Sequence, residues 1–169
     1  LDYVENYMFL IQKRFGNKII FQKEIKPDTL EYPIPKLILQ PLIENAIRHG
    51  IEPKGKGRIC LTSGYEKDFL ILQIMDDGVG IPADTLAWLS ASLSHPPSSH
   101  SQGKFSNTEV GILNVQRRIQ LIYGNPYGLK IKSSPEGTKV IINLPADGKM
   151  VAEEKAKRRK KIVSNCADR

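Results

Sequence analysis

The spacing of apolar and polar residues changes along the chain, and each change marks a structural element. Residues 1–15 carry an apolar side chain every three or four positions, which predicts an amphipathic helix that Gly16 and Asn17 end. This spacing suits a seam against a partner helix and suits packing on the domain's own core equally well. The apolar positions are Leu1, Val4, Met8, Ile11 and Phe15.

Alternating or continuous apolar runs predict five strands. The run at 69–75 is apolar almost throughout, which is typical of a central strand that is covered on at least one face. Short connections at 66–68 and 135–137 join two pairs of these runs directly. The predicted strands cover residues 18–25, 59–65, 69–75, 129–134 and 138–144.

Three further helices are predicted between these strands. The first runs to about Gly50, a natural stop, and has a late start or a kink at Pro41, which lacks a backbone N–H. The others cover about 84–93 and 112–123, and the Pro- and Ser-rich residues 95–103 between them are expected to form a mobile loop. This order of elements predicts an α/β (α+β) two-layer sandwich, in which helices pack on one face of a mixed, mostly antiparallel sheet.

Length and cysteine content fit one soluble domain. The 169 residues are enough for one sizeable core, and no apolar run is long enough to cross a bilayer. Cys60 and Cys166 are too few for a disulfide framework and lack the spacing of a metal site. The cysteines therefore favour a reducing, cytosolic setting.

The net charge of +7 is concentrated near the C-terminus. Residues 149–169 contain eight Lys or Arg and three acidic residues, a net charge of +5, which leaves +2 for residues 1–148. Such a tail is more often a solvated end than a nucleic-acid arm. A basic nucleic-acid-binding module that uses this tail stays open as an alternative function.

Polar residues at helical spacing form the first candidate site. Asn45, Arg48 and His49 are spaced i, i+3 and i+4, so they are expected to share one face of their helix, while apolar residues such as Ala46 point elsewhere. An amide oxygen can join the hydrated shell of Mg²⁺, and a guanidinium can neutralise phosphate oxygens. The alternative is a solvated face without a ligand.

The second candidate site follows the most apolar predicted strand. Asp76 ends that strand, where a carboxylate is costly to desolvate unless a donor reaches it, and an adenine amino group is such a donor. Gly78 and Gly80 would let a planar base or a phosphate approach the backbone, and Ile81 would add an apolar contact. The alternative is a tight turn, since Asp-Gly is a common turn dipeptide.

The third candidate site lies where the last predicted helix is expected to begin. Gly111 precedes Ile112 and Leu113 there, and the unpaired N–H groups of a helix N-terminus bind anions such as phosphate. The alternative is a plain junction between loop and helix. Thr138, at the start of the last strand, either closes the floor of a pocket or belongs to a turn.

Read in sequence, these motifs resemble the GHKL ATP-binding fold, also called the Bergerat fold, and above all the catalytic domain of sensor histidine kinases of the LytS and YesM type. Residues 38–50 are similar to the asparagine box of these kinases, 76–80 to their first glycine box and 111–123 to their second. The resemblance extends over residues 1–145. One departure is Glu109, which stands where the second glycine box usually has the first of two glycines.

The resemblance implies ATP and Mg²⁺ as cofactors, beneath a lid formed by residues 93–110. Asn45 would hold the metal ion, Arg48 and His49 would face the phosphates, and Asp76 would bind the adenine amino group. The other cofactor contacts that it implies are Gly78, Gly80, Ile81, Gly111, Ile112, Leu113 and Thr138.

The activity that the resemblance implies is that of a protein-histidine kinase. The γ-phosphoryl group of Mg-ATP would pass to a histidine on an upstream dimerisation domain, because no histidine of this chain has the context of such an acceptor. Residues 1–16 would then end a dimerisation or linker helix, 17–146 would form the catalytic domain and 147–169 the tail. Related ATPases have a water-activating glutamate where this chain has Pro41, which favours phosphoryl transfer over hydrolysis.

The expected partners follow from the same resemblance. They are the upstream histidine-phosphotransfer domain, a response regulator and a second copy in a full-length homodimer, and no nucleic acid is expected. The domain would be the cytoplasmic part of a membrane-anchored bacterial receptor. A stand-alone GHKL ATPase or an ATP-sensing module is the alternative.

Overall fold

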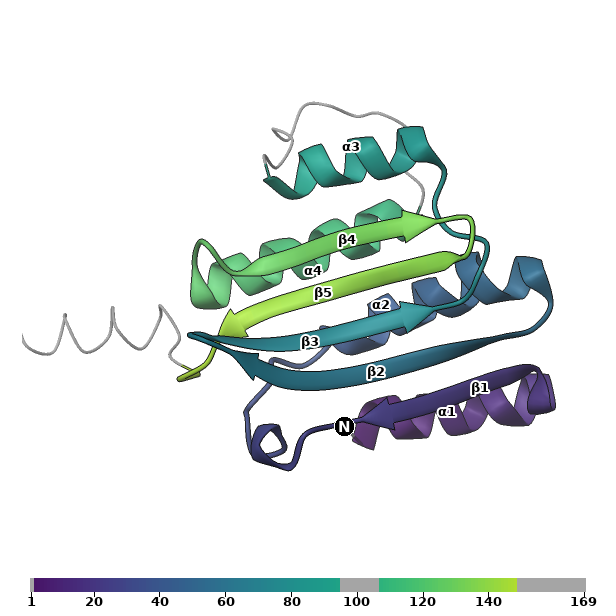
Figure 1. The fold of residues 1–169 in the computed structure, drawn as a ribbon, viewed down its shortest axis with the longest axis horizontal. Helices are drawn as coiled ribbons and strands as arrows, with labels where there is room; N and C mark the ends of the chain where they lie inside the picture. The colour runs from purple at the N-terminus through teal and green to yellow at the C-terminus, as the bar shows by residue number, and fades with distance from the viewer. Residues whose placement is uncertain (1, 95–106, 149–169) are drawn as a thin grey trace, which may run out of the picture.

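A five-stranded mixed sheet forms one layer of the protein (Figure 1). The computed structural model describes residues 2–94 and 107–148. The strand order is β1-β2-β3-β5-β4, with β1 parallel to β2 and the other three neighbouring pairs antiparallel. The apolar strand β3 is central, as its sequence predicts. The strands are β1 (Ile19–Glu24), β2 (Gly57–Glu66), β3 (Phe69–Asp76), β4 (Gly128–Ser134) and β5 (Gly137–Pro145).

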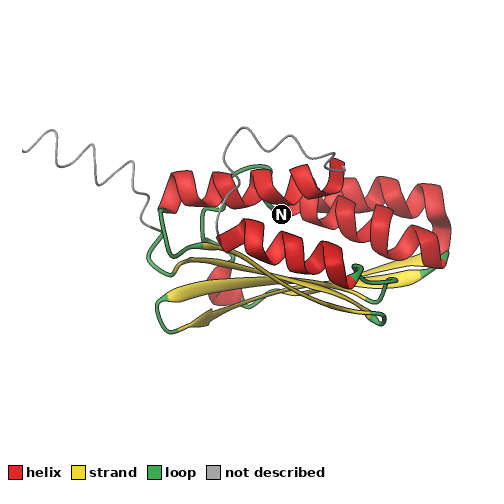
Figure 2. Ribbon diagram, turned by 90° about the horizontal axis from the view of Figure 1, so that it is seen from above, coloured by secondary structure: helices red, strands yellow, loops and turns green. Residues whose placement is uncertain are grey.

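The α-helices form the second layer, on one side of the sheet (Figure 2). The helix between β1 and β2 belongs to the long crossover that two parallel strands require. The predicted two-layer sandwich is confirmed. None of the helices in the described ranges is both long and apolar enough to span a membrane. The helices are α1 (Asp2–Phe15), α2 (Leu39–Asn45), α3 (Ala83–Ser94) and α4 (Asn107–Tyr123), with a π-helix at Ala46–Ile51 and 3-10 turns at Gly16–Lys18, Pro27–Thr29 and Glu52–Lys54.

The core lies between the two layers. Strand alternation directs Leu70, Leu72 and Ile74 of β3 toward the helices, and each of them has at most 4% of its surface exposed. The cross-strand register pairs Leu72 with Ile142 of β5 on the same face. This continuous apolar face is what the helices cover.

The apolar stripe of α1 packs on this core. Val4, Met8 and Ile11 are at most 9% exposed and belong to the same hydrophobic cluster as α2 and the sheet. Of the two alternatives for the apolar stripe, these three residues show packing on the domain's own core. The assignment of residues 1–16 to a dimerisation or linker helix stays a prediction.

Gly50 does not stop the helix that precedes it, so this part of the prediction is wrong. α2 starts late, at Leu39, which places Pro41 in its first turn as expected. The chain then continues through Gly50 as a π-helix and turns away at Gly55, whose φ is +81°. Gly50 is instead a contact glycine, because a Cβ on Gly78 would lie 2.3–2.5 Å from its backbone atoms.

The last helix begins five residues earlier than predicted. α4 starts at Asn107 rather than at about 112, so Gly111 lies inside the helix and not at its N-terminus. The intervening residues are compatible with a helix, and one glycine inside a helix costs only about 1 kcal/mol. The predicted lid over 93–110 is correspondingly shorter, because its two ends belong to α3 and α4. The loop predicted at 95–103 lies outside the described residues.

The close contact between Gly78 and Gly50 predicts that Gly78→Ala destabilises the fold. The added Cβ cannot be placed without moving backbone, so we expect a loss of about 3 kcal/mol in the free energy of unfolding, measured in urea. Gly111→Ala is the matched control. Its Cβ would meet only the Asn45 side chain, at an ordinary 3.7 Å, and the change is expected to stabilise α4 by about 0.5–1 kcal/mol. Equal stabilities of the two variants would contradict this description.

Candidate functional site

A small cavity lies between the helix layer and the inward face of β3 and β5. Its volume is about 50 Å³, and twelve residues line it. Seven of the twelve were predicted as site residues, although they are spread over nearly one hundred positions of the sequence. The seven are Asn45, His49, Asp76, Gly80, Ile81, Ile112 and Thr138.

Asp76 supplies the only carboxylate among the described residues that line this cavity. It ends β3 on the inward face, where Gly78 N–H donates to its Oδ1 at 2.9 Å. Burial raises the pKa of Asp76 above its ordinary value of 3.8, while backbone hydrogen bonds from Gly78 and Thr138 oppose that rise. The carboxylate is thus desolvated and only partly compensated, and a ligand that donates a hydrogen bond would complete its environment.

The floor of the cavity is made by two cross-strand pairs. Asp76 lies opposite Thr138, and Ile74 lies opposite Val140, all on the inward face of β3 and β5. A polar pair beside an apolar pair suits a flat ring with one polar edge. Ile74 and Val140 were missed as site residues, although strand alternation places each of them two positions from a predicted one.

The π-helix changes which side chains share a face. A π-helix holds more residues per turn than an α-helix, so His49 and Gly50 lie toward the cavity with Asn45. Arg48 is exposed and does not line the cavity, which corrects the expectation that it shares that face. Ala46 was expected to point elsewhere but lines the cavity, as Leu42 does one turn earlier.

Asn45 contributes an unpaired polar atom. Its Nδ2 is buried and has no hydrogen-bond partner among the described residues, which is uncommon for a buried amide and leaves a donor that a ligand could use. Gly111 of α4 approaches this amide, since a Cβ there would lie 3.7 Å from Nδ2. A half-turn of the amide exchanges its nitrogen and oxygen, so Asn45 can present either a donor or an acceptor.

His49 lies at the exposed edge of the cavity. Partial burial and the neighbouring Arg48 guanidinium lower the pKa of His49 below its ordinary value of 6.5. The protonated imidazole is therefore disfavoured, and His49 is better suited to hydrogen bonding than to supplying positive charge. Of the two basic groups that the sequence places near the phosphates, one is disfavoured as a cation and the other lies outside the cavity.

Three other predicted site residues do not line the cavity. Gly78 packs on Gly50, and Leu113 is half-buried against the core. Gly111 is inside α4, where its N–H is expected to be used within the helix, so the free N–H groups are those of residues 107–110. Gly111 lines instead a neighbouring groove between α2 and α4.

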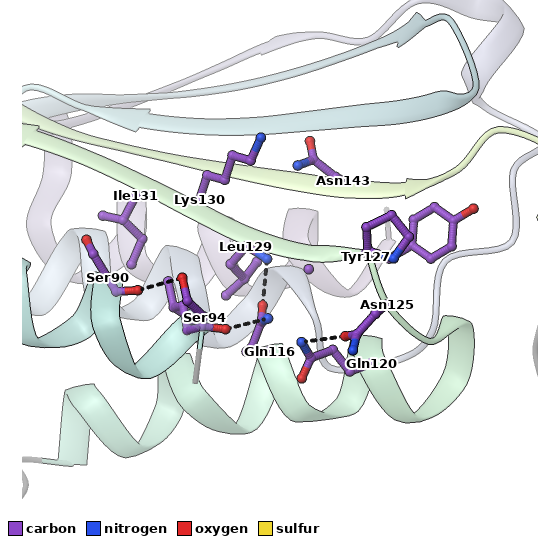
Figure 3. A pocket seen from close by; sticks show the side chains of 13 residues that line it. Ser90, Ser94, Gln116, Gln120, Asn125, Tyr127, Leu129, Lys130, Ile131 and Asn143 are labelled. Atoms are coloured by element: carbon purple, nitrogen blue, oxygen red, sulfur yellow. Dashed lines mark hydrogen bonds between the residues drawn. The ribbon is translucent and has the colours of Figure 1, made fainter. Parts of the chain in front are cut away.

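A larger hollow, of about 410 Å³, lies between α3, α4 and β4 (Figure 3). Both polar atoms of its buried amide are hydrogen-bonded, because Gln116 Nε2 donates to Leu93 O at 3.1 Å and its Oε1 accepts from Leu129 N at 2.6 Å. Gln120 donates in turn to the Asn125 side chain at 3.1 Å. These bonds tie α4 to α3 and β4, so we read them as structural. The unpaired Asn45 amide and the desolvated Asp76 carboxylate both belong to the smaller cavity.

Comparison with known proteins decides the family. Residues 32–148 match the family model described as histidine kinase-, DNA gyrase B- and HSP90-like ATPase. The chain belongs to this ATPase family. Membership implies that the domain binds ATP, which agrees with the resemblance that the asparagine and glycine boxes indicate.

Several sensor proteins are similar to this member of the ATPase family. The sensor histidine kinase YesM of Bacillus subtilis is 31% identical over 89% of the chain, and YpdA of Escherichia coli is 30% identical over 89%. The sensor protein LytS of Staphylococcus epidermidis is 29% identical over 86%. The chain spans about a quarter of the length of these relatives, 24%, 24% and 23% respectively.

Solved structures share the fold of this ATPase domain. The histidine kinase domain of a blue-light activated kinase from Erythrobacter litoralis superposes with a TM-score of 0.59 at 17% identity, covering 86% of this chain and 60% of that one. A mycobacterial sensor histidine kinase, MprB, gives 0.53 at 19% identity, covering 85% and 93%. At these identities the likeness concerns the fold alone.

The raised pKa of Asp76 predicts how the stability of this ATPase domain changes with pH. Because the folded-state pKa exceeds the unfolded value, the protonated carboxyl contributes stability at low pH, and this contribution is lost as the pH rises through the folded-state pKa. Relative to Asp76→Asn, the wild type should therefore lose unfolding free energy from about pH 3.8 upward, by at most about 1.4 kcal/mol per pH unit. Urea unfolding of both proteins across this range measures the difference. A wild type that gains unfolding free energy relative to Asp76→Asn as the pH rises would show the opposite shift.

Proposed function

We propose that this chain is the ATP-binding catalytic domain of a two-component sensor histidine kinase. It would transfer the γ-phosphoryl group of Mg-ATP to a histidine on an upstream dimerisation domain. The observation that carries the proposal is the pairing, in one cavity of an ATPase-family fold, of the desolvated Asp76 carboxylate with the unpaired Asn45 amide. The similarity to proteins named sensor histidine kinases supports the class of reaction.

The purine would bind at the β3 and β5 end of the cavity. Asp76 would accept a hydrogen bond from the adenine amino group, and the apolar surfaces of Ile74 and Val140 would contact the ring. Ligand pockets commonly measure ~300–1,000 Å³, far more than the 50 Å³ of this cavity. Nucleotide binding must therefore widen it, and we propose that Ile81 and Ile112, which lie on a loop and on α4, move apart.

Asn45 would bind the metal ion and contact the phosphates of the nucleotide. No group of three or more His, Cys, Asp or Glu side chains within residues 2–94 and 107–148 could hold a metal ion. A Mg²⁺ ion that keeps most of its waters and is carried by phosphates needs only one or two protein ligands, and the unpaired Asn45 amide fits that requirement. The ion would neutralise charge on the phosphates, and Asn45 would orient them.

The neighbourhood of Asn45 favours transfer to an acceptor over hydrolysis. Pro41 occupies the position one turn before Asn45, and Asp76 lies at the purine end. Glu44 accepts a hydrogen bond from Gln40 at 2.8 Å and lines the separate groove between α2 and α4. Among the residues whose side chains the structure describes, no carboxylate of the cavity is thus left to activate water beside Asn45. Phosphoryl transfer requires mainly positioning and charge stabilisation, which this arrangement provides.

The partners of the longer protein follow from this proposal. They are the upstream dimerisation and histidine-phosphotransfer domain, a response regulator and a second copy of the kinase. We propose a cytoplasmic location for the catalytic domain, in a membrane-anchored receptor. The lid role of residues between α3 and α4 also stays a prediction.

Asp76→Asn should weaken ATP binding if the carboxylate accepts the adenine hydrogen bond. We expect a loss of about 1–3 kcal/mol, which is roughly a 5- to 150-fold increase in Kd for Mg-ATP by titration calorimetry. Asp77→Asn is the matched control, because the exposed Asp77 carboxylate accepts from Arg58 N at 2.7 Å and does not line the cavity. Equal affinities of the wild type and Asp76→Asn would refute the role of Asp76.

Phosphoryl transfer is tested in the longer protein, with its upstream helices present. Incubation with labelled Mg-ATP should give an acid-labile, base-stable phosphate, as expected for phosphohistidine. Asn45→Ala should lower the rate by about 100-fold or more, because the phosphates lose their orienting amide. Release of free phosphate without labelled protein would favour the alternative of an ATPase or ATP-sensing module.

A further inference from the structure

Ser133 of β4 is hydrogen-bonded to two residues of the cavity wall and to Gly137, without lining the cavity itself. Its hydroxyl accepts a hydrogen bond from Ile81 N at 2.9 Å and donates to Gly137 O at 3.1 Å. The same oxygen lies 2.9 Å from Oγ1 of Thr138. Ile81 and Thr138 both face the cavity, so one hydroxyl links the residue that follows the glycine box to the cavity floor.

The hydrogen-bond count at Ser133 fixes the direction of the bond to Thr138. A hydroxyl has one proton and two lone pairs. The carbonyl of Gly137 can only accept, so the Ser133 proton goes to Gly137, and the Ile81 N–H uses one lone pair. The remaining lone pair can only accept, so Thr138 must donate its own proton to Ser133. The Thr138 oxygen then presents only lone pairs to the cavity.

The surrounding backbone leaves this arrangement little freedom. Gly80 has a φ of +74°, and a Cβ there would lie 2.0 Å from Ser134 O, so the glycine box rests directly on the end of β4. A Cβ on Gly137 would likewise lie 2.0 Å from Asp76 O. The hairpin of β4 and β5 is therefore locked between the glycine box and the end of β3, which holds Ser133 beside Thr138.

We propose that Ser133 is a positioning residue that selects amino purines over oxo purines, because it fixes the Thr138 hydroxyl as a hydrogen-bond acceptor. The inference rests on the proposed function, since it concerns the base of the same nucleotide. Asp76 and Thr138 are cross-strand neighbours, so two acceptors would face the polar edge of the base. The adenine amino group has two N–H donors for them, one for each acceptor.

An oxo purine lacks this match. Its carbonyl oxygen would face the lone pairs of Thr138 and find no donor there, although its ring N–H could still reach Asp76. A buried acceptor without a donor is costly. If Ser133 is removed, the Thr138 proton becomes free to turn toward the cavity and can donate to that carbonyl oxygen. Loss of Ser133 should therefore relax base selection while leaving Asp76 in place.

Titration calorimetry with Mg-ATP and Mg-inosine triphosphate tests this inference. The wild type should bind ATP more tightly, and Ser133→Ala should lower the ratio of the two affinities by about fivefold or more. Thr138→Val removes the acceptor itself and should lower the ratio similarly, and the double variant should lower it no further. Ser133→Thr keeps the hydroxyl and should restore most of the selectivity.

The outcomes separate this inference from the proposed function. If Ser133→Ala weakens the binding of both nucleotides equally, Ser133 has only a structural role and the inference fails. ATP binding by the wild type would still support the proposed function. If Thr138→Val leaves the ratio unchanged, Ser133 does not act through Thr138, and this variant decides the matter even if Ser133→Ala fails to fold. A wild type that binds neither nucleotide overturns both proposals.

Discussion

The partial burial of one carboxylate at the end of an apolar strand is the constraint on which the site depends. Asp76 follows Leu70, Leu72 and Ile74 on the inward face of β3, where a charge is costly unless groups donate to it. Backbone N–H groups of Gly78 and Thr138 offset part of that cost, yet the pKa remains raised because burial outweighs them. The fold thus maintains an acceptor whose environment a donor on the ligand completes.

Glycines make this burial possible, and their positions explain the glycine box in physical terms. A Cβ on Gly50 would lie 2.7 Å from Asp76 Oδ1, and one on Gly78 would collide with the backbone of Gly50. Val79 N donates to Gly50 O at 3.0 Å, which ties the loop after β3 to the π-helix. The π-helix in turn aims Asn45 and His49 at the same cavity. The carboxylate, the amide and the helix irregularity therefore belong to one packed unit.

Much of this organisation could be predicted from the sequence, because it depends on local patterns of apolar and polar residues. The five strands, the order of the helices and the position of Asp76 at the end of a central strand follow from apolar periodicity. The position of Arg48 outside the cavity could not be predicted, since it depends on a π-helical turn. The residue spacing there indicates an ordinary α-helix. The early start of α4 was also missed, because Gly111 looks like a helix boundary and is tolerated inside the helix. Ser133 gave no signal, since its role arises only when the hairpin brings it beside Ile81 and Thr138.

The central claim, that an adenine nucleotide spans the distance between Asp76 and Asn45, is tested most directly by a crystal structure with Mg²⁺ and a non-hydrolysable ATP analogue. The account predicts the adenine amino group within about 3 Å of the Asp76 carboxylate, directly or through one water, and the phosphates beside Asn45. It also predicts a cavity that has widened between Ile81 and Ile112. A nucleotide bound elsewhere on the domain, with Asp76 still facing an unchanged small cavity, would contradict it.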